Sequence, residues 1–549
     1  MQHYQKVEPA PVSPLAQEAR VRTRDGVHLG TDIYLPNGGV APGDTILIRL
    51  PYDKSGPYAF IPLVAEYFMA HGYRVVAQDV RGKFRSEGEA LLFVHEVEDG
   101  YDTIEWIVSQ PWSNGRVAMW GDSYYGYTQW AAAASGHPAL KAISPRVTGT
   151  TLGEPVKPDH VSAVEMGVTN MYPLTHFHGR DSYLWDLDWS KRNFAEQADE
   201  FMEKVGSRSI SYDQWVPHPV VLQRFPHGSP FAGRSVPVLH TIGWWDNCAP
   251  LSWADVEEIR QYPNWDAHHY LRVESIDHEN HTLLESEDDR IEDRSQEQIK
   301  EMLPRYLDPT LEFFEVFVRG NGRPSDLPPV TWNLARTDEM RTEVAWPPAS
   351  IRMQTLFAAV DGALTSARPA EESMVSWVHD PADLVPSSVP DAFSYLLYQP
   401  DEAPIGERSD VLTFTSVVQG SDVDLAGPAT ARVHVHSTGP VLDCFVRLLD
   451  VAPDGTALRI ARGQAQLRNA TEPETLEIDL GQLGYRLQAG HCLRAHLSSS
   501  DYPEFLPQPG TGGDAWTESA PLCRNNQFVL IGGRNAFAVE VPVLDGVLS

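Results

Sequence analysis

One turn constrains the fold of this chain more than any other stretch: Gly-Asp-Ser-Tyr-Tyr-Gly at residues 121–126. An apolar run of strand character, residues 115–120, precedes it, and an alanine-rich run of helical character, residues 127–134, follows. A serine between a buried strand and a helix, with glycine two positions before it, is the nucleophile-elbow pattern. Glycine suits the flanking positions because a Cβ there would meet the neighbouring elements. We therefore predict that Ser123 points out of a sheet at the N-terminus of a helix, which favours negative charge.

Short apolar strands alternate with helices on both sides of this turn. A hairpin over residues 21–36, with Asp-Gly at its turn, opens the pattern. Such alternation predicts a parallel sheet covered on both faces, with ligands bound at the carboxyl ends of its strands. The strands are expected at 45–50, 74–80, 140–144, 236–243 and 269–273, and the helices at 58–71, 96–109, 252–262 and 293–319.

The length of 549 residues predicts two or three domains, because single cores stop growing at roughly 250–300 residues. The α/β pattern occupies residues 17–151 and 233–325, which we assign to one catalytic domain. Residues 152–232 lack convincing strands and read as a helical cap, with a helix near 193–206. Residues 326–549 carry short alternating segments and turn residues, which indicates a β-sandwich or jelly roll.

Composition excludes several classes of partner. The formal net charge of −32 argues against nucleic acid and against an anionic membrane surface. The N-terminus has no apolar core of signal-peptide length, and no stretch reaches the roughly 20 apolar residues that span a bilayer. The four cysteines show no Cys-x-x-Cys spacing, which fits buried thiols better than disulfides or a zinc site. We expect a cytoplasmic protein, with the β-sandwich as a candidate surface for a homo-oligomer.

An elbow serine needs a base and an acid, and on such a sheet the acid precedes the base in sequence. Asp246 follows the strand at 236–243 and two tryptophans, and we favour it as the acid over a simple turn aspartate. His278 follows the strand at 269–273 and is the preferred base, with His281 in reserve. Glu274 and Asp277 are competing acids, but an acid so close in sequence to the base seldom reaches its Nδ1.

The tetrahedral oxyanion needs hydrogen-bond donors. The backbone N–H of Tyr124 follows the nucleophile directly and is one predicted donor. The second should come from the loop after the first central strand, where the hydroxyl of Tyr52 or a nearby backbone N–H is available. A tyrosine that merely packs in the core is the alternative for Tyr52.

These pieces together resemble the family of serine hydrolases that includes bacterial cocaine esterase, α-amino-acid ester hydrolases, glutaryl-cephalosporin acylases and X-prolyl dipeptidyl peptidases. The resemblance spans residues 20–545 and implies an α/β-hydrolase fold (a mostly parallel, doubly wound sheet) with a helical cap and a C-terminal jelly roll. In that family Gly-x-Ser-Tyr-x-Gly is the usual elbow, and a tyrosine in the position of Tyr52 is an oxyanion donor. The family's Gly-Pro-Trp-x-His before the base is replaced here by Glu-Ser-Ile-Asp-His. The motifs that carry the resemblance are at 51–54, 78–88, 121–126, 243–246, 312–314, 346–348, 408–412 and 498–503.

The resemblance implies a serine hydrolase that cleaves a small-molecule carboxylic ester or amide through an acyl-enzyme on Ser123, with neither a metal nor an organic cofactor. An X-prolyl-type aminopeptidase, an amidase or an acyltransferase would use the same triad. A non-catalytic carbohydrate-binding or assembly protein is the remote alternative. Four residues are candidates for contacting the substrate, with ordinary packing or a turn hydrogen bond as the alternative for each: Asp122, Trp245 and, in the predicted cap, Tyr172 and Trp185.

Overall fold

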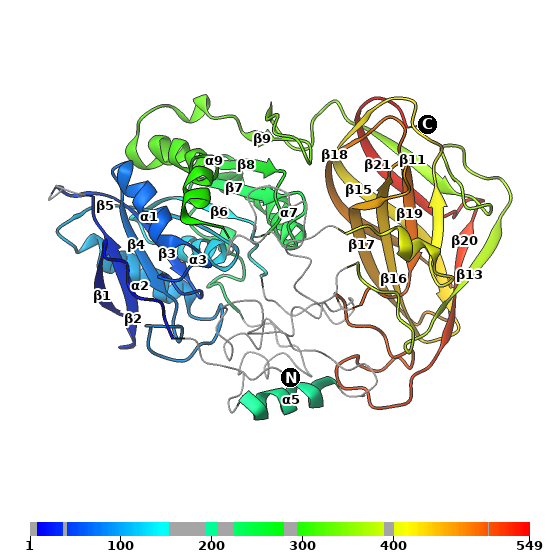
Figure 1. The fold of residues 1–549 in the computed structure, drawn as a ribbon, viewed down its shortest axis with the longest axis horizontal. Coiled ribbons are helices and arrows are strands. Elements are labelled where there is room, and N and C mark those ends of the chain that lie inside the picture. The colour runs from blue at the N-terminus through cyan, green and yellow to red at the C-terminus, as the bar shows by residue number, and fades with distance from the viewer. Residues whose placement is uncertain are drawn as a thin grey trace.

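The structure, a computed structural model, describes residues 8–36, 41–152, 194–205, 223–278, 294–388, 400–502 and 504–548. Figure 1 shows two bodies side by side, an α/β domain from the first part of the chain and an all-β domain from the last. This arrangement confirms the predicted fold class.

The α/β domain is built on a ten-stranded sheet with the order β1-β2-β4-β3-β5-β6-β7-β8-β9-β10. The pairs from β4 through β9 are parallel, whereas β1–β2, β2–β4 and β9–β10 are antiparallel. The predicted hairpin is confirmed as the pair of β1 and β2. The strands are β1 (Ala16–Arg22), β2 (His28–Tyr34), β3 (Gly43–Leu50), β4 (Arg74–Asp79), β5 (Ser113–Asp122), β6 (Leu140–Arg146), β7 (Val238–Gly243), β8 (His269–Glu274), β9 (Val330–Trp332) and β10 (Arg341–Glu343).

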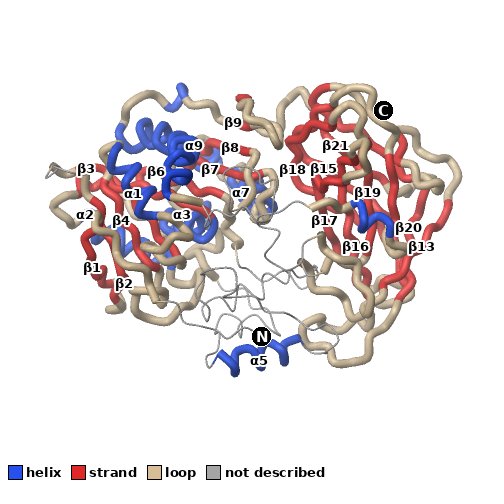
Figure 2. Tube along the Cα trace, viewed as in Figure 1, coloured by secondary structure: helices blue, strands red, loops and turns tan. Residues whose placement is uncertain are grey.

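Helices cover both faces of this sheet (Figure 2). Alternate residues of one strand enter two different cores: Ile46 and Ile48 pack with α1 and α9, whereas Leu47 packs with α2, α3 and α7. A strand that is apolar on both faces is what a doubly wound parallel sheet requires. The helices are α1 (Ile61–Ala70), α2 (Glu96–Val108), α3 (Ser123–Ala134), α5 (Phe194–Val205), α7 (Ala249–Ile259), α8 (Pro263–Asp266) and α9 (Gln296–Phe314).

The all-β domain packs two antiparallel sheets around one apolar core. One sheet has the order β12-β11-β21-β15-β20-β13, with β18 also paired to β15, and the other has the order β14-β19-β16-β17. The strands are β11 (Arg352–Ala358), β12 (Leu364–Thr365), β13 (Ser373–His379), β14 (Leu412–Thr415), β15 (Val423–Ser437), β16 (Val441–Val451), β17 (Ala457–Arg468), β18 (Glu474–Leu487), β19 (Cys492–Ser498), β20 (Asn525–Ile531) and β21 (Ala538–Asp545).

The sequence predicts the boundary between the two domains at residue 326. In the structure β9 and β10, which follow that position, still pair with the α/β sheet, and the sheets change between Glu343 and Arg352. Three-residue strands carry too little alternation to be recognised in a sequence. Of the predicted cap, the structure describes α5 and residues 223–232; Tyr172 and Trp185 lie outside the described residues. The backbone N–H of Ala195 in α5 donates to the carbonyl of Trp516 in the β domain.

None of the helices in the described ranges combines the length and the apolar character needed to cross a bilayer.

Candidate active site

The strand β5 ends at Asp122 and the helix α3 begins at Ser123, whose φ of 50° lies in the left-handed region. This is the strained turn that an elbow serine needs. A Cβ on Gly121 would lie 2.1 Å from the Tyr125 ring, and one on Gly126 would lie 2.6 Å from Thr148. Both glycines are therefore required for the close approach of the strand, the turn and the helix.

Asp246 stands in the turn after β7, where its side chain is fully buried. Gly243 creates the room for this turn, because a Cβ there would lie 2.7 Å from the carbonyl oxygen of Ile276 and 3.0 Å from Cβ of Asp246. The Oδ1 atom of Asp246 accepts a hydrogen bond of 3.0 Å from the backbone N–H of Cys248. The loop after β7 thus fixes a buried carboxylate beside the loop after β8.

His278 lies in that second loop and joins the other two residues. Its Nδ1 is 2.6 Å from Oδ1 of Asp246, and its Nε2 is 2.9 Å from Oγ of Ser123. With the proton on Nδ1, the ring donates to the carboxylate and leaves the Nε2 lone pair toward the serine. The structure therefore brings the three predicted residues into one hydrogen-bonded chain, while His281 lies outside the described residues.

The surroundings of His278 stabilise its protonated form. Burial alone would lower the pKa of this imidazole, but the side chains of Cys248 and Asp246 outweigh burial and raise the pKa well above its ordinary value. A base that gains stability on protonation is suited to accept the proton of Ser123.

Two hydrogen-bond donors are near Ser123 Oγ. The hydroxyl of Tyr52 donates to this oxygen over 3.4 Å, and edge-on contacts with Tyr58 and Tyr125 hold the Tyr52 ring. The backbone N–H of Tyr124 belongs to the first turn of α3, where N–H groups have no partner within the helix. Its side chain is anchored elsewhere, with the hydroxyl donating to Glu96 over 2.9 Å.

Comparisons with known proteins agree with this geometry. The family profile of X-Pro dipeptidyl-peptidase (S15 family) matches residues 25–279, and that of the X-Pro dipeptidyl-peptidase C-terminal non-catalytic domain matches residues 321–540. The first match contains Ser123, Asp246 and His278, and the two together span most of the chain. The chain belongs to the X-Pro dipeptidyl-peptidase (S15) family. It is therefore a serine hydrolase in which the β domain corresponds to the non-catalytic part.

Relatives of this S15 chain include an esterase and an aminopeptidase. Cocaine esterase of Rhodococcus sp. (strain MB1 Bresler) is 29% identical, over 91% of this chain and 93% of that protein. An aminopeptidase from a marine sediment Thaumarchaeota archaeon superposes with a TM-score of 0.81 at 21% identity, covering 98% of this chain and 99% of the other. An α-amino acid ester hydrolase superposes with a TM-score of 0.77 at 22% identity, covering 96% of both chains. The two structural matches show a shared fold.

Asp122, a candidate substrate contact, forms its side-chain hydrogen bonds with other residues of the α/β domain. Its Oδ1 accepts from Nε of Arg146 over 3.1 Å, and its Oδ2 accepts from the hydroxyl of Tyr306. Arg146 also lies 3.5 Å from Glu274, and all these groups are buried. Both carboxylate oxygens of Asp122 are therefore bonded to partners from β6 and α9, and not by the local turn hydrogen bond that was the alternative to a substrate contact. Sequence reasoning missed Arg146 and Tyr306, although an arginine at the end of a buried strand is a signal that some buried anion must balance it.

Trp245, the second candidate substrate contact among the described residues, is half-buried where the α/β domain meets the β domain. Its ring lies edge-on to Tyr485 of β18, and the guanidinium of Arg336 lies 5.6 Å from its centre. Its neighbour Trp244 packs against Gly484 of the same strand. The indole N–H of Trp245 also donates to the carbonyl of Arg459 over 3.5 Å, so Trp245 links the turn that holds Asp246 to the β domain.

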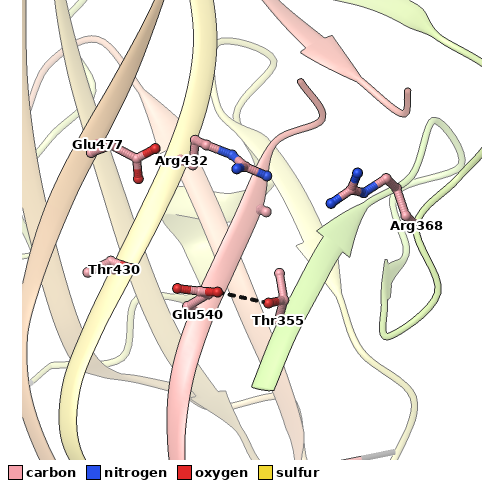
Figure 3. A pocket seen from close by; sticks show the side chains of 7 residues that line it. Thr355, Arg368, Thr430, Arg432, Glu477 and Glu540 are labelled. Carbon is pink, nitrogen blue, oxygen red and sulfur yellow. Dashed lines mark hydrogen bonds between the residues drawn. The ribbon is translucent and has the colours of Figure 1, made fainter. Parts of the chain in front are cut away.

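A hollow of about 280 Å³ lies on the outside of the β domain (Figure 3). Its walls come from adjacent strands: Glu540 on β21 accepts a hydrogen bond of 3.0 Å from Thr355 on β11, while Arg432 of β15 is paired in register with Glu477 of β18. Opposite charges that face each other across strands stabilise a sheet. The hollow contains no nucleophile beside a base, so we assign the chemistry to the Ser123 site.

Proposed function

We propose that this chain hydrolyses a carboxylic ester of a small molecule through an acyl-enzyme on Ser123. The observation that carries the proposal is the hydrogen-bonded chain from Ser123 Oγ through His278 to Asp246, with the Tyr52 hydroxyl on the same oxygen. A serine is a weak nucleophile unless a base takes its proton, and this arrangement supplies that base.

Acylation follows from the roles of these side chains. Nε2 of His278 removes the proton from Ser123 as its Oγ attacks the ester carbonyl, and Asp246 stabilises the imidazolium that forms. The developing oxyanion takes hydrogen bonds from the N–H of Tyr124 and the hydroxyl of Tyr52. His278 then gives its proton to the departing alcohol, and the acyl group remains on Ser123.

Deacylation reverses these roles with water as the nucleophile. His278 removes a proton from a water molecule, which attacks the acyl-enzyme while the same two donors hold the oxyanion. The histidine finally returns the proton to Ser123, and the carboxylic acid leaves.

The charges around the nucleophile support an ester over a peptide with a free amino terminus. An ammonium group would need an available carboxylate. Two acids close to the elbow are already matched by cations, Asp122 by Arg146 and Glu274 by Arg272, the latter pair 2.7 Å apart. The match to an esterase over more than nine-tenths of both chains supports the same preference.

A fluorophosphonate probe tests the nucleophile. Intact-mass measurement should find one adduct on the wild type and none on Ser123→Ala, with equal melting temperatures for the two proteins. A well-folded wild type that takes no adduct would favour the binding or assembly alternative.

A substrate comparison tests the finer assignment. We expect p-nitrophenyl esters to be hydrolysed with a kcat/KM at least about 100-fold above that for aminoacyl-prolyl anilides, a difference of ~2.7 kcal/mol in barrier. Faster cleavage of the anilides would identify an X-prolyl-type aminopeptidase. Faster transfer to an added amine or alcohol than to water would identify an acyltransferase.

A further inference from the structure

Cys248 lies against the acid and the base of the candidate active site. It follows Asp246 by two positions, immediately before α7, and is a buried thiol with 2% exposure. The Sγ of Cys248, a carboxylate oxygen of Asp246 and a ring nitrogen of His278 all lie within 4.8 Å of one another. Within the described parts of the chain, these residues form the one such group of three potential metal ligands.

The two carboxylate oxygens of Asp246 differ in their hydrogen bonding. Oδ1 accepts hydrogen bonds from His278 and from the backbone N–H of Cys248, whereas the buried Oδ2 has no hydrogen-bond partner among the described residues. A buried carboxylate oxygen without a donor is costly, and a cation would offset that cost.

The three side chains suit a particular class of cation. A thiolate, an imidazole and a carboxylate together select zinc and similar thiophilic ions over magnesium or calcium. Tetrahedral zinc bonds of about 2.0–2.3 Å place ligand atoms roughly 3.3–3.8 Å apart, so binding would require these side chains to move closer together than the 4.8 Å limit within which they lie here. Water would fill the fourth position.

We propose that Asp246, Cys248 and His278 form an inhibitory site for a thiophilic divalent cation such as zinc or cadmium. The cation is a regulator here and takes no part in the reaction. This inference rests on the proposed function only for its effect on turnover; binding itself does not depend on the substrate.

Binding removes the base whichever ring nitrogen of His278 the cation takes. If it binds Nδ1, the ring proton moves to Nε2, which then has no lone pair for the proton of Ser123. If it binds Nε2, that lone pair is itself occupied. In both cases the thiol of Cys248 releases one proton to solvent, a protonated His278 ring releases a second, and the carboxylate of Asp246 keeps its charge. No oxidant or other reactant is required.

Cadmium titration tests the site directly, because cadmium thiolates absorb in the ultraviolet. The wild type, Cys248→Ser and Cys523→Ser are compared, the last being a matched control at an exposed cysteine outside the cluster. We expect one equivalent of cadmium to produce the band in the wild type and in Cys523→Ser. Loss of a residue that merely hydrogen-bonds to a metal ligand typically weakens metal binding about 10- to 100-fold. Because Cys248→Ser removes a ligand itself, the cadmium concentration that half-saturates this variant should be at least about 100-fold higher than for the wild type.

The effect on the active site is measured on the same samples. Cadmium should suppress both p-nitrophenyl ester hydrolysis and labelling of Ser123 by fluorophosphonate in the wild type, and EDTA should restore both. If esters are not substrates, the absorption band and protection from labelling still test the site. Equal cadmium binding by Cys248→Ser would overturn the proposal, as would a band that disappears in Cys523→Ser. Cys248→Ala, checked by its melting temperature, provides a second variant.

Discussion

Both domains bury charged side chains, but they neutralise them differently. In the α/β domain, Asp246 holds a histidine that can gain and lose a proton. In the β domain, Asp501 is held by two guanidiniums, with Arg447 at 2.8 Å and Arg462 at 3.1 Å, and by the hydroxyl of Ser387 at 2.7 Å. An arginine does not release its proton in a protein, so this second cluster cannot relay one.

The difference indicates where chemistry resides in this architecture. At the carboxyl ends of parallel strands, separate loops bring together an acid, a base and a nucleophile, and one carboxylate oxygen of the acid has no hydrogen-bond partner among the described residues. In the antiparallel sandwich, the charges on β16, β17 and the segment after β19 lock those elements to one another. We therefore expect a neutralised carboxylate to abolish turnover in one domain and to lower stability in the other.

The largest effect is expected from Asp246→Asn. An asparagine amide cannot stabilise the imidazolium and favours the wrong tautomer of His278, so kcat should fall by about 10⁴-fold. Steady-state hydrolysis of a p-nitrophenyl ester measures the loss, and thermal unfolding checks that the fold is retained. A kcat within tenfold of the wild type would remove Asp246 from the triad.

Asp501→Asn is the counterpart in the β domain. It leaves the buried cations Arg447 and Arg462 without their shared anion, so the free energy of unfolding should fall by about 3–5 kcal/mol. The kcat per folded molecule should stay within twofold of the wild type. Chemical denaturation at pH 7 measures the first quantity, and active-site titration with fluorophosphonate normalises the second. An unchanged stability with a reduced kcat would reverse the comparison.

The stability that Asp501 contributes depends on pH in a direction set by its pKa. Burial would raise the pKa of Asp501, but Arg447, Arg462 and Arg459 outweigh it and lower the pKa to about 2. The stabilisation is therefore complete above the ordinary aspartate value and is lost as pH falls toward 2. The stability gap between the wild type and Asp501→Asn should narrow as pH is lowered below about 4.

Tyr52→Phe separates the oxyanion donor from the packing of its ring. The aromatic contacts with Tyr58 and Tyr125 remain, but the hydroxyl that reaches Ser123 is lost, so kcat should fall by about 10²–10³-fold with KM nearly unchanged. Tyr58→Phe is the matched control on the adjacent ring and should change kcat much less. Equal losses in the two variants would assign Tyr52 to packing.

The sequence predicted the parts of the site that depend on local chain order. A strand, a glycine and a serine followed by a helix are contiguous, so Ser123 could be located from its neighbours alone. Asp246 and His278 follow strands whose apolar runs are visible, and the carboxyl ends of parallel strands meet at one edge. These three residues could be selected without knowledge of the distances between them.

Partners from distant elements could not be predicted in this way. Tyr306 on α9 and Arg146 at the end of β6 meet Asp122 only because the folded sheet and helix place them together. The strands β9 and β10 were not predicted, because three residues are too few to show the alternation of apolar and polar residues that marks a strand. Their membership of the α/β sheet depends on pairing with residues far away in the chain. Likewise, nothing local to Cys248 indicates that its thiol lies against His278.

The smallest effect is expected where the two domains touch, at Gly484→Ala. The added Cβ would lie 2.1 Å from Cζ2 of Trp244, so the domains must separate slightly or the indole must shift, at a cost of about 1–3 kcal/mol in unfolding free energy. Because Trp244 precedes Asp246 by two residues, kcat should also fall, by about tenfold or less. Gly420→Ala is the matched control, since a Cβ at Gly420 meets no atom within 4 Å and should change neither quantity. A loss of stability without any change in kcat would mean that the β domain supports the fold but not the position of the catalytic acid.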